Sequence, residues 1–362
     1  MISGSIAREV LDSHEGRAVR TIHSGSSGAT VRIVECPNGS HVAVKQAKAT
    51  HVSAARQAEA RDEISPWFAE RLPKVLFAGP FQGHDVLVTE CPSVLTFADA
   101  VAEQGSTPTL VTSWQGVISS LTEMWQESAR PGYSPESSTR NHLLRLKCGI
   151  DGLGFTLASL GNSLSDLRSF VVNDTDHVGW HTAWQRLAAL GSPAERVVCH
   201  GDPQPTNVLL DPELRRHLID WEWSGLHHDW RMMVSHLIGW WFVDAILSHA
   251  WGCFTARRYT LSLAYQDLDL RSVVPWTDLA ADAFQVMTDV TRRDQDLAAV
   301  SLHTALLLLR EVPRASESRS RHHLLAPLLG EAVRLINSAD NGPPHPLIQT
   351  LVQPSYRKTA IT

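Results

Sequence analysis

The sequence predicts an α+β protein with a small β-rich N-terminal lobe, residues 1–92, and a larger, mostly helical C-terminal lobe, residues 93–362. Residues 30–45 contain two β-rich runs joined by Pro-Asn-Gly-Ser, and Asn-Gly is a strong hairpin signal. Residues 114–125 and 297–312 keep apolar side chains at helical spacing. The chain has 362 residues, 43% hydrophobic and 19% charged, which suits one globular protein of two lobes.

The N-terminal lobe is predicted to contain a hairpin, a helix and two further strands. Strand 30–36 turns back into a second strand, 41–45, which ends on Lys45. Ser53 is a suitable N-cap for a helix, because its hydroxyl can accept a hydrogen bond from the first turn, and strong helix formers follow it over residues 54–63. Two strands, 72–77 and 84–89, are then expected around a Gly-Pro turn at residues 79–80.

Residues 197–223, VVCHGDPQPTNVLLDPELRRHLIDWEW, place three oxygen-bearing side chains at the ends of short apolar strands. Asn207 follows Asp202 by five positions, and Asp220 follows Asn207 by thirteen. Phosphoryl transfer from a nucleotide needs such a set. One carboxylate orients the acceptor hydroxyl, while a second carboxylate and an amide oxygen hold Mg²⁺.

Each of these residues also has an ordinary structural interpretation. A lone Asp in a loop is usually a cap or turn residue, and a lone Asn before a strand is usually a turn former. The combination of three residues at these spacings favours the catalytic interpretation of Asp202, Asn207 and Asp220. His200 keeps the structural interpretation, as a side chain that braces the loop.

This segment resembles the aminoglycoside phosphotransferase family of small-molecule kinases. The motif is His-Gly-Asp-x-x-x-x-Asn, with Gly201 where protein kinases carry Arg, and Ile-Asp-Trp-Glu at 219–222 stands where they carry Asp-Phe-Gly. Asp229 lies where the family has an Asp that opens the next helix. The resemblance implies a bilobal protein-kinase-like fold and transfer of the γ-phosphoryl group of ATP or GTP to a small-molecule hydroxyl with Mg²⁺. Because only a short turn follows Asp220, no activation-loop switch is expected.

The resemblance also implies roles for individual residues. Asp202 would be the catalytic base, and Asn207 and Asp220 the metal ligands. Lys45 ends a Val-Ala-Val-Lys strand like the kinase Val-Ala-Ile-Lys motif, and would grip the phosphates with Glu59 as its partner. Glu63 is the alternative to Glu59 as the partner of Lys45. The nucleotide base would bind to the backbone of Glu90, Cys91 and Pro92, where Pro92 has no N–H to donate. The loop over the phosphates would consist of Ser24, Gly25, Ser26, Ser27 and Gly28.

The acceptor is expected to bind against the C-terminal lobe. Acidic and basic residues are equal in number over the first 90 residues, so the net charge of −6 comes wholly from the residues after 90. Tryptophans cluster between residues 221 and 251. Such features are more often surface charge and helix packing than a binding site. Stacking on tryptophan would favour a nucleoside or other glycosylated antibiotic over a polycationic aminoglycoside. The candidate acceptor residues are Asp229, Trp240, Trp241 and Asp244.

Composition excludes several other classes of protein. The five cysteines are odd in number and form no Cys-x-x-Cys pair, which indicates reduced thiols, a cytoplasmic setting and no zinc site. No N-terminal apolar leader is expected, and the most apolar segment, 237–247, is interrupted by Asp244 and is too short to span a membrane. The acidic balance disfavours nucleic acid as a partner.

Three alternatives remain at this point. A metabolic kinase acting on choline, homoserine or a sugar would share the motif. A catalytically silent nucleotide-binding regulator is disfavoured because Lys45, Asp202, Asn207 and Asp220 are all present. A protein kinase is disfavoured by Gly201 and the missing activation segment. The acceptor, the preference between ATP and GTP, and the oligomeric state are left open.

Overall fold

The structure is a computed structural model, and it divides the chain into two compact units. Unit 1 comprises Met1–Met124 and Val198–Gly225, and unit 2 comprises Trp125–Val197 and Leu226–Thr362. The predicted boundary near residue 92 falls inside unit 1, where the segment after the N-terminal sheet is bonded to β10 (Val208–Leu210): the Leu210 N–H donates to the Leu95 carbonyl. The described residues are 18–23, 30–36, 38–47, 52–68, 71–131, 164–191, 195–317, 319–340 and 342–352.

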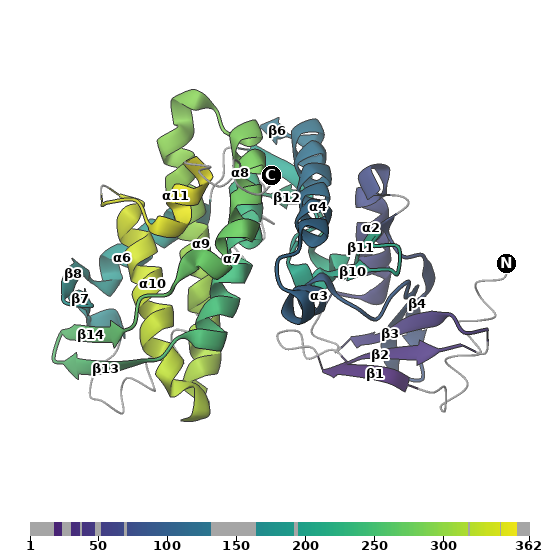
Figure 1. The fold of residues 1–362 in the computed structure, drawn as a ribbon, viewed down its shortest axis with the longest axis horizontal. Coiled ribbons are helices and arrows are strands. Elements are labelled where there is room, and N and C mark those ends of the chain that lie inside the picture. Colours follow the sequence, from purple (N-terminus) through teal and green to yellow (C-terminus); the bar gives the residue numbers. More distant parts are fainter. Residues whose placement is uncertain are drawn as a thin grey trace. The chain divides into compact units, whose positions relative to one another are not determined.

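Unit 1 is built on a five-stranded antiparallel sheet in the order β1-β2-β3-β5-β4 (Figure 1). Alternate residues of a strand share one face, and here the face of alternating valines is buried, with Val42, Val44, Val86 and Val88 in one cluster. The strands are β1 Ala18–His23, β2 Thr30–Glu35, β3 His41–Ala47, β4 Val75–Phe81 and β5 His84–Glu90.

One of the two predicted hairpin turns is confirmed and the other is wrong. The turn between β2 and β3 contains Gly39 at φ +79°, as Asn-Gly predicts. The predicted turn at Gly79-Pro80 lies instead inside β4, and Gln82 and Gly83, both at positive φ, make the turn. Pro80 is tolerated there because β4 is an edge strand, where a missing N–H interrupts no ladder on the open side.

Helix α2, Ala54–Phe68, covers part of this sheet, packing against β4 and β5. The predicted cap is confirmed, since the Arg56 N–H donates to the Ser53 Oγ at 3.2 Å. Ala60, Ile64 and Phe68 repeat every four residues and are buried, which carries the helix beyond the predicted end at residue 63.

The remainder of unit 1 consists of residues 198–225 and the helices beside them. The hairpin of β10 and β11 is joined to the start of α3 by a bridge between Thr96 and Leu209. Thr96 and Asp99 form a capping box that fixes this helix start. The elements are α3 Phe97–Gln104, α4 Pro108–Ser128 (which continues into unit 2), β9 Glu195–Cys199 (which enters from unit 2), η4 Pro205–Asn207, β10 Val208–Leu210, β11 Arg216–Leu218 and η5 Trp221–Trp223.

Unit 2 is mostly helical, as the sequence predicts (Figure 1). Helix α7 packs on α8 and α9, α9 packs on α10, and α8 on α11. The helices are α6 Trp180–Ala188, α7 Trp230–His249, α8 Val274–Met287, α9 Arg293–Glu317, α10 Leu325–Ser338 and α11 Pro346–Val352, with short 3₁₀ turns at Leu164–Asp166, Ala189–Gly191, Leu270–Ser272, Val290–Arg292 and Arg319–Leu324.

Unit 2 also carries short strands. One sheet has the order β13-β14-β7-β8, in which β14 and β7 are parallel, and another has the order β12-β9-β6. Within the described ranges, no helix has the length and apolar character needed to cross a membrane. The strands are β6 Arg130–Pro131, β7 Ser169–Val172, β8 Thr175–Val178, β12 Gly225–His228, β13 Gly252–Arg257 and β14 Thr260–Tyr265.

Candidate active site

His200 braces the loop that leads from β9 to β10. Its side chain is fully buried, and its Nε2 lies 2.8 Å from the carbonyl oxygen of Ile219. Burial lowers the pKa of His200 by disfavouring the imidazolium, and this outweighs the nearby carboxylates. A neutral ring donates Nε2–H to that carbonyl, so His200 fixes the backbone directly before Asp220. This contact agrees with the structural interpretation of His200.

Gly201 occupies a position that no other residue fits. Its φ is +84°, and a Cβ built on it would lie 2.3 Å from the carbonyl oxygen of Trp223. The adjacent Ser224 hydroxyl donates to the His200 carbonyl at 2.9 Å. The loop backbone is thus packed directly on η5, which explains why glycine stands where protein kinases carry arginine.

Replacement of Gly201 by alanine should therefore lower the free energy of unfolding of unit 1. The left-handed backbone conformation alone costs about 1–3 kcal/mol for a residue with a Cβ, and the contact with Trp223 adds to it. Urea denaturation should show a clearly lower midpoint for Gly201→Ala. Gly83→Ala is the matched control, because Gly83 has φ +80° but open space around its Cβ position. Equal midpoints for the two variants would contradict the close packing on η5.

The catalytic loop brings Asp202 and Asn207 together. The Asn207 Nδ2 donates to the Asp202 carbonyl oxygen at 2.9 Å, which leaves the amide oxygen as the ligand atom. The half-buried Asp202 carboxylate accepts a hydrogen bond from the Gln204 Nε2 at 3.0 Å. The Ile219 N–H donates to the Asn207 carbonyl at 2.9 Å, so Asn207 lies beside the strand end that carries Asp220.

Asp220 and Glu222 share one ammonium group. The Lys45 Nζ lies 2.5 Å from the Asp220 Oδ1 and 2.9 Å from the Glu222 Oε2. Asp220 adopts a left-handed conformation, φ 61° and ψ 49°, which Asp tolerates better than most residues. Burial would lower the pKa of Lys45, but the two carboxylates outweigh burial and raise it. Lys45 is therefore a charged ammonium at neutral pH.

The predicted partner of Lys45 is not the one that the structure pairs with it. Glu59 has a side chain 68% exposed and lies 3.6 Å from the Arg56 guanidinium, and Glu63 pairs with the same guanidinium at 2.7 Å. Both glutamates of α2 thus lie beside Arg56, while Asp220 and Glu222 hold Lys45. Sequence reasoning missed Glu222 in this role, although its position two residues after Asp220 was the available signal.

The predicted nucleotide contacts are only partly described. Ser24, Gly25, Ser26, Ser27 and Gly28 lie outside the described residues. At the predicted hinge, the Glu90 N–H donates to the Lys74 carbonyl and the Cys91 N–H to the His41 carbonyl, each at 2.9 Å. Both N–H groups are therefore already hydrogen-bonded within the protein and are not free to donate to a base. Contact of this segment with the nucleotide base stays a prediction.

Asp229, a predicted acceptor residue, belongs to a buried ion network in unit 2. It caps α7 by accepting from the Arg231 N–H, and its carboxylate lies 3.1 Å from the Arg231 Nη1 and 3.5 Å from the His303 Nε2. Burial alone would raise the pKa of Asp229, but His303 and Arg231 outweigh burial and lower it. Arg231 also pairs with Asp296 at 2.5 Å. The network gives Asp229 a structural role, and the acceptor role assigned to it stays a prediction.

The predicted tryptophans divide into a core residue and a half-buried one. Trp241 is 5% exposed and stacks on Trp276 with ring centroids 4.9 Å apart, so its ring takes part in core packing, and the prediction that it lines an acceptor pocket stays a prediction. Trp240 is half-buried and meets Trp241 edge-on. Asp244 is exposed, and burial of part of its surface raises its pKa. Trp240 and Asp244 remain as acceptor candidates.

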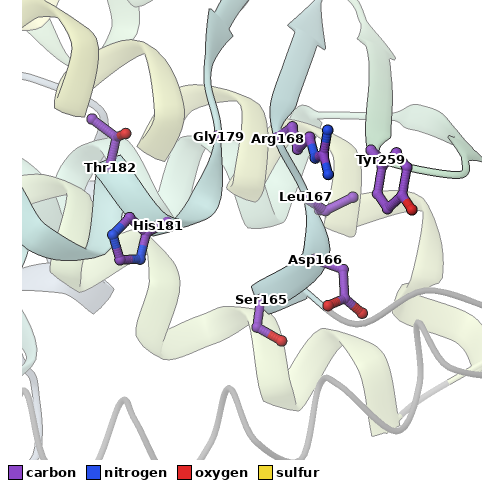
Figure 2. Close-up of a pocket in the computed structure, with 8 residues that line it drawn as sticks. All are labelled: Ser165, Asp166, Leu167, Arg168, Gly179, His181, Thr182 and Tyr259. Atoms are coloured by element: carbon purple, nitrogen blue, oxygen red, sulfur yellow. The ribbon is translucent and has the colours of Figure 1, made fainter.

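Unit 2 also contains an open pocket of about 440 Å³ (Figure 2). Arg168 and Tyr259 lie on one side of it, with the guanidinium carbon 4.4 Å from the ring centroid, and His181 and Thr182 lie at the start of α6 on the other. None of the four predicted acceptor residues lines this pocket.

Asn207 and Asp220 have the donor set that suits Mg²⁺. An amide oxygen and a carboxylate are hard oxygen ligands, and Mg²⁺ keeps several waters and substrate phosphates as its other ligands. Asp220 is 39% exposed and can accept a cation from solution. Over the part of the chain that the structure describes, no group of three or more His, Cys, Asp or Glu side chains is placed to hold a metal ion.

The model of the phosphotransferase enzyme family, APH, matches residues 18–229, which is more than half of the 362 residues. The chain belongs to this family. The predicted family and the predicted class, an enzyme that phosphorylates hydroxyl groups, are thereby confirmed. So is the protein-kinase-like fold, with its β-rich N-terminal region and helical C-terminal region. The match ends at Asp229, so most of unit 2 lies outside it.

The phosphotransferase is also similar to several solved structures. An aminoglycoside phosphotransferase, APH(3'')-Id, from Streptomyces rimosus is 19% identical, with 84% of this chain and 96% of that chain covered and a TM-score of 0.46. A choline/ethanolamine kinase family protein from Mesorhizobium loti is 15% identical, with 97% and 98% covered and a TM-score of 0.49. A choline kinase from Streptococcus pneumoniae is 12% identical, with 93% and 99% covered and a TM-score of 0.47. No curated protein matches the sequence.

Proposed function

We propose that this phosphotransferase moves the γ-phosphoryl group of ATP or GTP to a hydroxyl group of a sugar-bearing antibiotic, of the nucleoside or aminoglycoside type, and so inactivates it. The observation that carries the proposal is the joint placement in unit 1 of Asp202, Asn207 and Asp220 around one loop, with Lys45 bonded to Asp220 at 2.5 Å. The same proposal places the enzyme in the cytoplasm, where the nucleotides and reduced thiols are found.

In this mechanism Asp202 accepts or orients the proton of the acceptor hydroxyl. Its carboxylate is oriented by Gln204 and its backbone by Asn207, so the base is fixed before the substrate arrives. Lys45 donates to the phosphate oxygens as a point charge, a role that suits an ammonium with three donors. The transition state is loose, so positioning and neutralisation of charge supply most of the rate.

Asn207 and Asp220 would hold Mg²⁺ through the amide oxygen and the carboxylate. When bound, Mg²⁺ supplies positive charge that neutralises the phosphate oxygens during transfer. The left-handed backbone of Asp220 and the His200–Ile219 hydrogen bond fix the chain at Asp220 and directly before it, which would hold the carboxylate in place for the cation.

The identity of the acceptor is tested with labelled nucleotide. Purified protein should transfer the label from [γ-³²P]ATP or GTP, with Mg²⁺, to at least one hydroxyl compound in a panel of nucleoside antibiotics, kanamycin- and streptomycin-type aminoglycosides, choline, homoserine and simple sugars. A sensitive host that expresses the gene should resist the same antibiotic. Transfer only to choline, homoserine or a sugar would contradict the antibiotic role and indicate a metabolic kinase. No transfer to any acceptor, with bound nucleotide, would indicate a silent regulator.

A further inference from the structure

Lys45 is held by a carboxylate of a different segment from the one that its sequence position suggests. We propose that Glu222 is the positioning residue for Lys45, and that it keeps the ammonium in place while Asp220 is occupied by metal. This inference rests on the proposed function for the role of the metal, and on the geometry of unit 1 for the pair itself.

The two carboxylates on Lys45 differ in burial. The Glu222 side chain is 6% exposed and that of Asp220 is 39% exposed, while the Lys45 side chain is 12% exposed. A buried carboxylate without a cation is costly, because its lost hydration is replaced by nothing. Loss of the contact between Glu222 and Lys45 therefore has a high free-energy cost. The more exposed Asp220 can exchange its hydrogen bond from Lys45 for a contact with a cation from solution.

The backbone of Glu222 is fixed independently of Lys45. Its 3₁₀ turn, η5, is closed by the hydrogen bond from the Ser224 N–H to the Trp221 carbonyl, and its next residue, Trp223, packs against Gly201. On the other side, Lys45 lies in β3 between β2 and β5, paired with Val31 and Leu87. The ion pair thus joins a central strand of the sheet to the turn that follows Asp220.

The α2 carboxylates have another partner. Glu63 bonds to the Arg56 Nη1 at 2.7 Å, and the exposed Glu59 lies near the same group. Arg56 therefore neutralises the face of α2 from which a kinase of this architecture was expected to reach the lysine. Lys45 is therefore positioned by the same turn that follows the proposed metal ligand Asp220. One short segment would then determine the positions of both the lysine and the metal.

The first test compares carboxylate variants by calorimetric titration with Mg-ATP and Mg-GTP and by kinetics. Glu222→Gln should weaken nucleotide affinity and raise the nucleotide KM by roughly 10–100-fold, as loss of an orienting partner does, with the acceptor KM unchanged. Glu222→Asp keeps the charge and should recover part of the loss. Glu213→Gln, at an exposed ion pair in the same unit, is the control. Loss of affinity in Glu59→Gln with wild-type affinity in Glu222→Gln would overturn the inference.

The second test needs no acceptor, so it separates this inference from the proposed function. Urea denaturation should give a lower midpoint for Glu222→Gln than for wild type. In a Lys45→Met background the same substitution should raise the midpoint, because Glu222 is then a buried carboxylate without its cation. This reversal supports the pair even if no tested compound is phosphorylated. An equal shift in both backgrounds means that Glu222 does not pair with Lys45, and it would overturn the inference.

Discussion

Asp202→Asn should reduce kcat by about 10²–10⁴-fold, the usual contribution of a positioned general base, with little change in nucleotide affinity. The asparagine keeps the size of the side chain and can still bond to Gln204, which lies 3.0 Å from the carboxylate, but it cannot accept the hydroxyl proton. Single-turnover kinetics with saturating Mg-ATP would measure the loss, and calorimetry would show whether nucleotide binding is retained.

The control for this result is Asp62→Asn. Asp62 is in the same unit, its side chain is 74% exposed, and it pairs with Arg61 at the neighbouring position. It should behave as wild type in both assays. A variant at Asp202 that keeps more than half of the wild-type kcat would remove the catalytic role from this residue.

Asp220→Asn should weaken binding of the Mg-nucleotide and abolish transfer together. A hard cation loses its anionic oxygen ligand, and the loss in affinity should exceed the roughly 10–100-fold that an outer-shell partner costs. Asparagine is chosen because it tolerates the left-handed backbone at φ 61°, so the change tests charge rather than strain. Titration of Mg-ATP and Mg-GTP at several Mg²⁺ concentrations is the measurement.

Asn207→Ala provides the comparison within the same metal site. Its effect should have the same sign and be smaller, because a neutral amide oxygen is lost rather than a carboxylate. Its buried Nδ2 bond to the Asp202 carbonyl is lost as well, so some of the damage should appear in kcat. Wild-type affinity and Mg²⁺ dependence in Asp220→Asn would overturn the assignment of this site.

Elements that are determined by residues close to one another in the sequence could be predicted from the sequence. The β2–β3 hairpin follows from Asn-Gly, and the start of α2 follows from Ser53, because both signals act within a few residues. The turn between β4 and β5 was predicted three residues too early. Gly79-Pro80 is a turn signal by composition, but an edge strand accepts proline, and this depends on sheet order that no local pattern contains.

The candidate site shows the same division. The spacing of Asp202, Asn207 and Asp220 was sufficient to place the first two before one short strand and Asp220 after the next, because the β10–β11 hairpin leaves few geometries for such spacings. The Glu222 contact was not predictable in this way. It requires Asp220 to be left-handed and residues 221–223 to form a 3₁₀ turn, and helix or strand propensity does not encode either one. The core packing of Trp241 was not predictable either, because stacking in a core and stacking on a ligand have one sequence signature.

The buried ion network at the start of α7 limits how the part of the chain after residue 229 can be exchanged between relatives. The family match ends at Asp229, which would be the obvious junction for a chimera. A junction there would separate Asp229 from its partner Arg231 and from His303 and Asp296 on α9, unless the donor sequence carries the same charges. A chimera that exchanges this part of unit 2 should therefore carry α7 and α9 as a pair, with Asp229 included.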